Sequence, residues 1–134
     1  MEVTIEALLN LFVSWTKLKI KEHIKEREFY FYEKQVWWAS LGQNIGREQN
    51  GKNSNFERPI LVFKKFNEDT LWAISASSKI KIGKYYEIFH LGEKEFSLNL
   101  SQLRLISSKR LLRLSGEISK KEYDKIKERV RELI

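Results

Sequence analysis

The sequence predicts a mainly β fold, a small sheet or barrel with one helix at each end. The chain has 134 residues, which suffices for one domain with a real core. Between residues 29 and 106, short runs of aromatic and β-branched residues are bounded by glycine or polar clusters, as in successive strands. Helical periodicity flanks this region on both sides. We therefore expect a helical N-terminal extension over residues 1–28 and a β-rich domain over residues 29–134.

The N-terminal segment has apolar residues at helical spacing, and Thr4 precedes them as a candidate N-cap. These apolar residues are Ile5, Leu8, Leu9, Phe12, Trp15 and Leu18. The pattern predicts an amphipathic helix from about residue 5 to about residue 26, with a mainly basic second half. Such a helix is expected to cover one side of the β domain.

Four runs with strand composition follow, over residues 29–41, 59–66, 70–76 and 79–89. Residues 79–82 alternate strictly between lysine and isoleucine, which would place the two lysines on one face of a strand. Residues 96–100 and 103–106 are expected to form further short strands. Short strands in direct succession favour an antiparallel sheet or barrel over a parallel α/β fold.

The last segment predicts a second helix. Ser119 and Glu122 form the pattern of a capping box. Apolar residues then keep helical spacing to the C-terminus, at Tyr123, Ile126, Val130 and Leu133. The expected layout is helix, β domain, helix.

The composition restricts the classes of function. The chain has no cysteine and two distant histidines, His23 and His90, so neither a disulfide nor a metal site is expected. A net charge of +7 suggests an anionic partner, nucleic acid or an acidic protein, although it also fits a merely solubilising surface. The apolar run 7–13 is too short to span a bilayer and lacks the features of a secretory signal. We expect a cytoplasmic protein without membrane contact.

A long polar loop separates the hydrophobic runs 36–41 and 60–63. Two to five residues suffice to join two strands in a hairpin, so a longer loop is expected to hold a ligand. The loop ends at Arg58, and Pro59 biases Arg58 toward extended geometry. The loop glycines lack the Lys-Ser/Thr ending of a phosphate loop, so a nucleotide-binding enzyme is not expected.

A second group of polar residues ends the run 70–76 and includes Ser77 and Lys79. A turn near residues 67–69 would make this strand antiparallel to the preceding one and return Ser77 toward Arg58. An arginine, a hydroxyl and lysines that converge would suit a phosphate group. The alternative is a structural arginine and ordinary strand serines.

The segment W-W-A-S-L-G-Q-N-I-G-R-E-Q-N-G-K, followed by R-P-I-L-V, resembles the PemK/MazF family of toxin ribonucleases. The segment S-Q-L-R-L-I-S-S-K-R-L-L at residues 101–112 is similar to a second motif of that family. The resemblance covers about residues 35–134, and the N-terminal helix looks like an extension found in longer members. It implies a Src-homology-3-like barrel of the CcdB/PemK/MazF type, usually a homodimer, that cuts single-stranded RNA without a metal or another cofactor.

The resemblance also suggests site residues. The arginine of the R-P motif falls on Arg58, and the family's catalytic threonine falls on Ser77, with Ser75 and Ser78 as alternatives. Arg58 would stabilise charge on the phosphate, since it stays protonated, and Ser77 would bind the phosphate or orient the 2′-hydroxyl.

Four further residues are candidates for substrate binding: Glu48, Gln49, Phe56 and Lys79. Glu48 would contact RNA or order the loop by accepting from backbone amides. Phe56 would stack on an unpaired base or anchor the loop to the core. Trp37 and Trp38 point to opposite faces of their strand, so one belongs to the core and the other packs on a helix or a dimer partner.

The implied activity is that of an mRNA interferase, in which the 2′-hydroxyl attacks the adjacent phosphate and leaves a 2′,3′-cyclic phosphate and a 5′-hydroxyl. A basic toxin also implies a co-encoded acidic antitoxin that covers the same groove. Two other functions remain open at this point. One is a weakened barrel that binds RNA or protein without cutting, and the other is a toxin that poisons gyrase.

Overall fold

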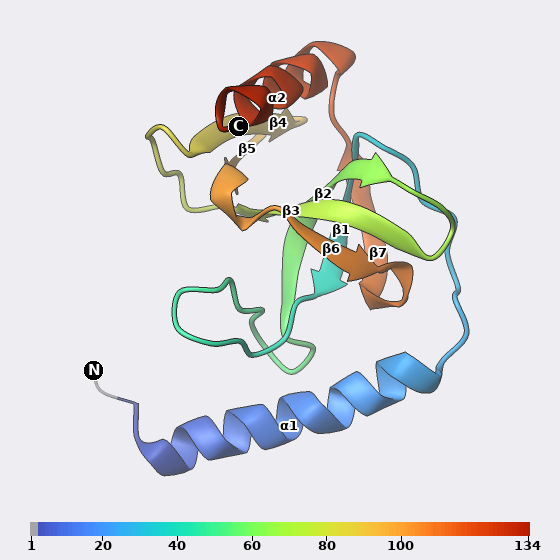
Figure 1. Cartoon of the computed structure of the whole chain (residues 1–134), viewed down its shortest axis with the longest axis vertical. Helices are drawn as coiled ribbons and strands as arrows, with labels where there is room; N and C mark the ends of the chain where they lie inside the picture. Colours follow the sequence, from blue (N-terminus) through green and yellow to red (C-terminus); the bar gives the residue numbers. More distant parts are fainter. Residues whose placement is uncertain (1–2) are drawn as a thin grey trace.

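The computed structural model describes residues 3–134. Two helices enclose seven strands in chain order (Figure 1). The elements are α1 (Ile5–Ile24), β1 (Gln35–Ser40), β2 (Glu57–Lys65), β3 (Thr70–Ser77), β4 (Tyr86–Leu91), β5 (Lys94–Asn99), β6 (Arg104–Ser107), β7 (Leu111–Glu117) and α2 (Lys120–Glu132), with short 3₁₀ turns at Leu100–Gln102 and Ser108–Arg110. The mainly β class and the two flanking helices are confirmed.

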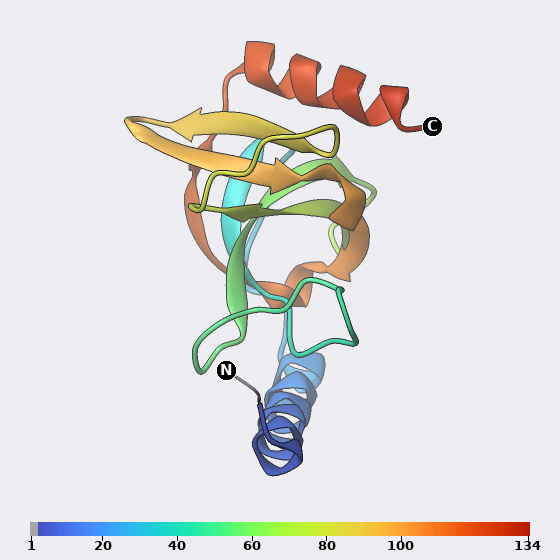
Figure 2. The same ribbon diagram turned by 90° about the vertical axis from the view of Figure 1, so that its left-hand side faces the viewer.

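The strands form one antiparallel sheet in the order β4-β5-β3-β2-β1-β7, and β6 also pairs with β3. The first half of β3 pairs with β6 and its last two residues pair with β5, so the sheet bends around β3 into a barrel. Figures 1 and 2 show α1 and α2 at opposite ends of this barrel.

Two buried clusters fill the barrel. One lies between the sheet and α2, where Tyr123 and Ile126 of the helix join Leu61, Ile74 and strand residues of β4 and β5. The other holds Trp37 with apolar residues of β1, β2, β3 and β7. Trp37 is therefore the core member of the tryptophan pair. Trp38 lies on the other face, where the guanidinium of Arg113 stands 4.8 Å from its ring centre, instead of packing on a helix.

Two predicted strands are shorter in the structure. Residues 29–34 are irregular because Lys34 adopts a left-handed backbone (φ 75°) and the Tyr32–Gln35 turn precedes β1. Residues 79–85 are also irregular, and the strand begins at Tyr86. The alternation in residues 79–82 does not mark a buried face, since Ile82 is 88% exposed. Strand β7, which pairs with β1, was not anticipated.

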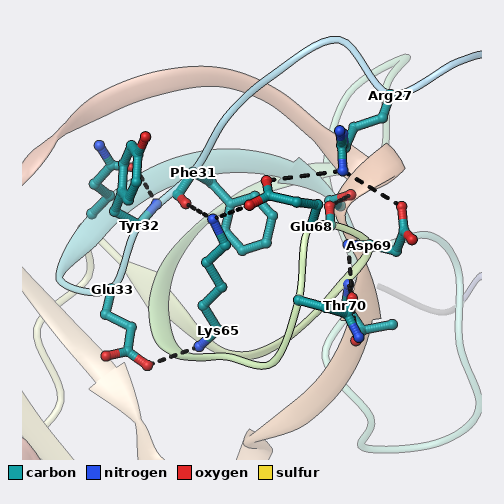
Figure 3. Close-up of polar contacts among 11 residues, drawn as sticks. Arg27, Phe31, Tyr32, Glu33, Lys65, Glu68, Asp69 and Thr70 are labelled. Atoms are coloured by element: carbon teal, nitrogen blue, oxygen red, sulfur yellow. Dashed lines mark hydrogen bonds and ion pairs between the residues drawn. The ribbon is translucent and has the colours of Figure 1, made fainter.

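The chain between α1 and β1 is held by polar contacts to the β2–β3 hairpin (Figure 3). The Nζ of Lys65 donates to the carbonyl oxygen of Phe31 and is paired with Glu68, both at 2.9 Å. Lys65 also donates its backbone N–H to Glu33. Arg27 lies 3.9 Å from the carboxylate of Glu68. These contacts fix the irregular segment against the barrel without strand pairing.

Helix α2 begins as predicted. The Ser119 hydroxyl accepts from the backbone N–H of Glu122 at 3.1 Å. The Glu122 carboxylate does not complete a capping box, because it accepts from the backbone and ring nitrogens of His90 on β4. The N-terminus of α2 is thereby tied to the sheet.

Helix α1 also begins as predicted, with the Thr4 hydroxyl accepting from Ala7. Its docking on the barrel is narrow, because only Trp15 and Glu22 are buried within it. The Trp15 ring packs against Phe56 at 5.6 Å between centres, and the guanidinium of Arg110 lies 5.5 Å from the Trp15 ring. Burial raises the pKa of Glu22. The helix therefore covers much less of the domain than its apolar composition suggested.

Candidate active site

The long loop between β1 and β2 is organised by Asn44. The Asn44 side-chain nitrogen donates to the carbonyl oxygens of Leu41 and Gln49, and the Asn44 backbone N–H donates to Asn50. Gly51 donates to the carbonyl oxygen of Gly42 at 2.8 Å and closes the loop on itself. The loop is therefore a hydrogen-bonded structure with a defined shape.

Two glycines allow this shape. A Cβ at Gly51 would lie 1.5 Å from the carbonyl oxygen of Phe56, so the backbones could not approach. Gly42 has φ +85°, and a Cβ there would lie 2.2 Å from the Trp15 ring. The loop thus needs glycine at position 51 so that two backbone segments can meet. It needs glycine at position 42 for the left-handed conformation and to leave room for the Trp15 ring of α1.

Arg58 lies on β2 immediately after this loop, with its side chain turned back to it. Its Nε donates to the carbonyl oxygen of Asn50. With the Gln49 side-chain oxygen directed at the guanidinium, that oxygen accepts from Nε and Nη2, both at 2.8 Å. Burial lowers the pKa of Arg58, but an arginine remains charged at any physiological pH. The loop therefore holds a partly desolvated positive charge in a fixed position.

Strand β3 brings two serines to the same place. Strands β2 and β3 are antiparallel with Ile60 opposite Ser75, and this register continued by two residues sets Arg58 opposite Ser77. Alternation puts Ser75 and Ser77 on the same face. Ser75 is buried, and its hydroxyl has no hydrogen-bond partner among the described residues. The predicted convergence of Ser77 with Arg58 is found.

The irregular segment after β3 is fixed at Lys79. Its backbone N–H donates to the Ser77 hydroxyl at 3.1 Å, and its carbonyl oxygen accepts from the hydroxyl of Ser97 on β5 at 3.0 Å. Since the Ser77 oxygen accepts from Lys79, its proton remains available to a ligand.

These groups surround one cavity of about 220 Å³. Its lining comes from the loop, β2, β3, the segment after β3, β4 and β5: Gln49, Lys52, Arg58, Ser75, Ala76, Ser77, Lys79, Lys81, Tyr86, Ser97 and Asn99. The lining contains four cationic side chains and no carboxylate. Such a cavity favours an anion that can also accept hydrogen bonds from hydroxyls, which describes a phosphate.

Two larger hollows adjoin this cavity. One, of about 380 Å³, shares Lys52, Arg58 and Ser77 with it and continues past Trp38 and Phe96. The other, of about 750 Å³, shares Lys81 and Tyr86 and continues to α2. The cationic cavity thus lies between two hollows that each contain an aromatic side chain.

The structure brings together four of the six predicted site residues, namely Arg58, Ser77, Gln49 and Lys79. Glu48 lies outside the cavity lining, and its carboxylate accepts from the backbone N–H of Ile45, which is the loop-ordering alternative. Phe56 is 5% exposed under Trp15 and is not placed to stack on a base. Its observed position matches the anchoring alternative, because the packing of α1 on the loop buries its ring.

Several lining residues were not anticipated. Lys52 lies in the loop, and Ser97 and Asn99 come from β5, a strand with no motif that marks it as part of a site. The lysine–isoleucine alternation at residues 79–82 did single out Lys81, but as a residue on one face of a strand and not as part of a site. Ser75 was an alternative to Ser77, and both line the cavity.

No helix within residues 3–134 is long and apolar enough to cross a membrane.

The comparisons with known proteins agree with this architecture. A family model described as the PemK-like, MazF-like toxin of type II toxin–antitoxin systems matches residues 33–134. The crystal structure of MazF from Deinococcus radiodurans is similar, with a TM-score of 0.61 and 18% sequence identity, covering 79% of this chain and 97% of that one. No curated protein matches the chain. The family model spans well over half of the chain, so the protein belongs to the PemK-like, MazF-like family of type II toxins.

Proposed function

We propose that this toxin is a metal-independent endoribonuclease, an mRNA interferase that cuts single-stranded RNA at specific sequences. The observation that carries the proposal is the convergence of Arg58, Ser77 and three lysines on one cavity whose lining has no carboxylate. A phosphodiester is the anion that such a set of donors suits best.

In the proposed reaction, the 2′-hydroxyl oxygen of the substrate attacks the adjacent phosphorus. The O2′–P bond forms, the P–O5′ bond breaks, and the 2′-hydroxyl proton passes to solvent while the leaving 5′-oxygen gains a proton. Negative charge grows on the non-bridging oxygens, and the Arg58 guanidinium stabilises it because Gln49 and the Asn50 carbonyl hold it in place beforehand. The products are a 2′,3′-cyclic phosphate and a 5′-hydroxyl.

The two serines have different roles in this scheme. Ser77 donates its free proton to a non-bridging oxygen or orients the 2′-hydroxyl, because its own oxygen is fixed by Lys79. Ser75 offers a second, unpartnered hydroxyl deeper in the cavity. A ligand oxygen there would relieve the desolvation cost of a buried polar group without a partner.

The adjoining hollows suit the nucleotides on either side of the phosphate. Tyr86 lies on one side, and Trp38 and Phe96 lie on the other. Unpaired bases stack on aromatic side chains with little sequence preference, so base identity would be read by polar groups at the edges of these hollows.

Membership of a type II toxin family implies an antitoxin partner. We propose that this antitoxin carries an acidic segment that covers the cationic cavity, that the toxin domain forms a homodimer, and that the protein acts in the cytoplasm. A co-expressed neighbouring gene product should copurify with the chain. Its failure to do so would count against that pairing.

The direct test is incubation of the purified chain with long single-stranded RNA in the presence of a chelator, followed by mapping of the new ends. We expect cyclic phosphate and 5′-hydroxyl ends at recurring sequences. Arg58→Ala should lower the cleavage rate by about 10²–10³-fold, the usual effect of losing one charge-stabilising donor. Ser77→Ala should lower it as well.

Matched controls lie outside the cavity. Arg131 on α2 is exposed and paired with Glu128, and Ser14 lies on the exposed surface of α1, so Arg131→Ala and Ser14→Ala should leave cleavage unchanged. Full cleavage by a folded Arg58→Ala protein would refute the site. Binding without cleavage would favour a binding module, and intact RNA with trapped DNA breaks would favour a gyrase poison.

A further inference from the structure

Helix α1 carries two apolar stripes, and only one of them contacts the barrel. The contacting stripe contains Trp15 and Leu18, which are buried or half-buried, and the buried Glu22 lies beside them. The second stripe lies about 140° around the helix, at 3.6 residues per turn. It consists of Ile5, Leu9, Phe12, Val13, Ile20 and Ile24, with exposed fractions from 38% at Phe12 to 86% at Ile5.

The second stripe is open to an approaching molecule. Figures 1 and 2 show α1 at one end of the molecule, with the barrel on one side of it and no other described segment on the opposite side. A row of exposed aliphatic and aromatic side chains along a whole helix indicates an interaction surface.

Four of the six stripe residues lie symmetrically about the middle of the helix. Ile5–Ile24 has its midpoint between Ser14 and Trp15. Ile5 and Ile24 are equally far from that midpoint, as are Leu9 and Ile20. A two-fold symmetric interface requires a patch that complements itself when turned around. An antiparallel pair of such helices would bring Leu9 of each copy level with Ile20 of the other.

The charges of α1 favour the same arrangement. Glu6 is in the first turn, whereas Lys17, Lys19 and Lys21 are in the second half. Antiparallel pairing places Glu6 near the lysine-rich half of the other helix and keeps the two lysine-rich halves apart. Parallel pairing would set like charges side by side, which is unfavourable.

We propose that α1 is a self-association element that pairs antiparallel with α1 of a second copy of this chain. The family model begins at residue 33, so this contact lies outside the segment that defines the family. It is therefore separate from any dimer of the toxin domain, and it does not depend on the proposed ribonuclease activity. A chain with both contacts would form a higher assembly than the toxin domain alone.

The association is tested by sedimentation velocity over a range of concentrations. Leu9 and Ile20 are exposed, so Leu9→Lys and Ile20→Lys should fold normally, which circular dichroism checks. Each variant should lower the assembly by one step, from dimer to monomer or from tetramer to dimer. Asn10→Lys adds the same charge beside the stripe and should leave the assembly unchanged.

The orientation is tested with spin labels, since the chain has no cysteine of its own. Ala7→Cys and Ser14→Cys place labels on exposed positions away from the stripe. In an antiparallel pair, the two Ala7 positions are separated along the axis by about 23 Å and the two Ser14 positions by about 2 Å, at 1.5 Å per residue. In a parallel pair, both separations would be equally short.

Three results would overturn the proposal. The first is an assembly that Leu9→Lys and Ile20→Lys leave unchanged. The second is equal label separations at the Ala7 and Ser14 positions. The third is a helix that never self-associates but binds an acidic peptide or vesicles of anionic phospholipid, which would assign the stripe to another partner.

Discussion

Replacing Trp15 with alanine should detach α1 while the barrel stays folded. Trp15 is 6% exposed and is the only buried apolar residue of the helix. It belongs to neither of the two clusters that fill the barrel. Its contacts are to the loop, through Phe56 and Gly42, and to Arg110. Apart from the buried Glu22 and a hydrogen bond from Lys109 to the His23 carbonyl oxygen, the apolar docking of the helix therefore rests on one side chain that the barrel core does not need.

The size of the effect follows from the buried area. A tryptophan buries about 150–250 Å², which at about 25 cal/mol per Å² gives roughly 4–6 kcal/mol as an upper value. Replacement of buried aromatic residues by alanine costs about 3–5 kcal/mol in practice. Most of the stability of a helix in a protein comes from tertiary packing, so a loss of this size leaves the helix without its main support.

Native-state hydrogen exchange measures this directly. The measurement is made in a Leu9→Lys background, so that pairing of α1 with a second copy does not protect the helix. With Trp15→Ala added, amides of Ile5–Ile24 should exchange close to the unprotected rate, while amides of β2 and β3 keep their protection. Trp72→Ala is the matched control, because Trp72 is 40% exposed at the barrel surface and its loss should leave α1 protected. Equal loss of protection in helix and barrel would refute the separate docking of α1, and so would an unchanged helix.

Three further predictions concern single sites. Ser75→Ala should leave the free energy of unfolding unchanged or raise it by about 1–2 kcal/mol, because it removes a buried hydroxyl that has no partner among the described residues. Chemical denaturation measures this, and a clear decrease in the free energy of unfolding would contradict the prediction. The pKa of His90 should lie above 6.5, because its ring is hydrogen-bonded to Glu122. The interaction of protonated His90 with Glu122 therefore stabilises the fold below pH 6.5, and this stabilisation is lost as the pH rises through the raised pKa. Glu122→Gln should lower the midpoint of the His90 titration measured by NMR. An unchanged midpoint would contradict the pairing of His90 with Glu122. Gly51→Ala should destabilise the loop by about 1–3 kcal/mol and impair cleavage, since the new Cβ would overlap the Phe56 carbonyl, whereas normal loop protection in hydrogen exchange would show that the backbone can yield.

The different roles that we propose for Arg58 and Lys79 follow from how deeply each charge is buried. Arg58 is partly desolvated and fixed by the loop, so it acts at a defined point. Lys79 is exposed and contributes a more diffuse attraction. Electrostatic stabilisation is strongest where the group is preorganised and water is excluded. We therefore expect the loss of Lys79 to weaken RNA binding more than it slows the chemical step.

Sequence patterns predicted that two groups of the candidate site lie together. The register of a hairpin is determined by its turn and by alternation along the strands, so the convergence of Arg58 and Ser77 could be inferred locally. The ordering of the loop by Asn44 and the contribution of Lys52 to the positive charge of the cavity could not be inferred locally. Each depends on how the loop folds back on itself.

By itself, the sequence determined the mainly β class, both helix N-caps and the antiparallel pair that carries Arg58 and Ser77, because these follow from periodicity and from short-range hydrogen bonds. Only the tertiary structure decided the remaining cavity lining and the orientation of α1. Apolar residues at helical spacing predict a helix but not which of its faces is covered, since burial depends on segments far away in the chain. Trp15 fills a space that Gly42 leaves open, and this contact turns the second apolar stripe of α1 away from the barrel.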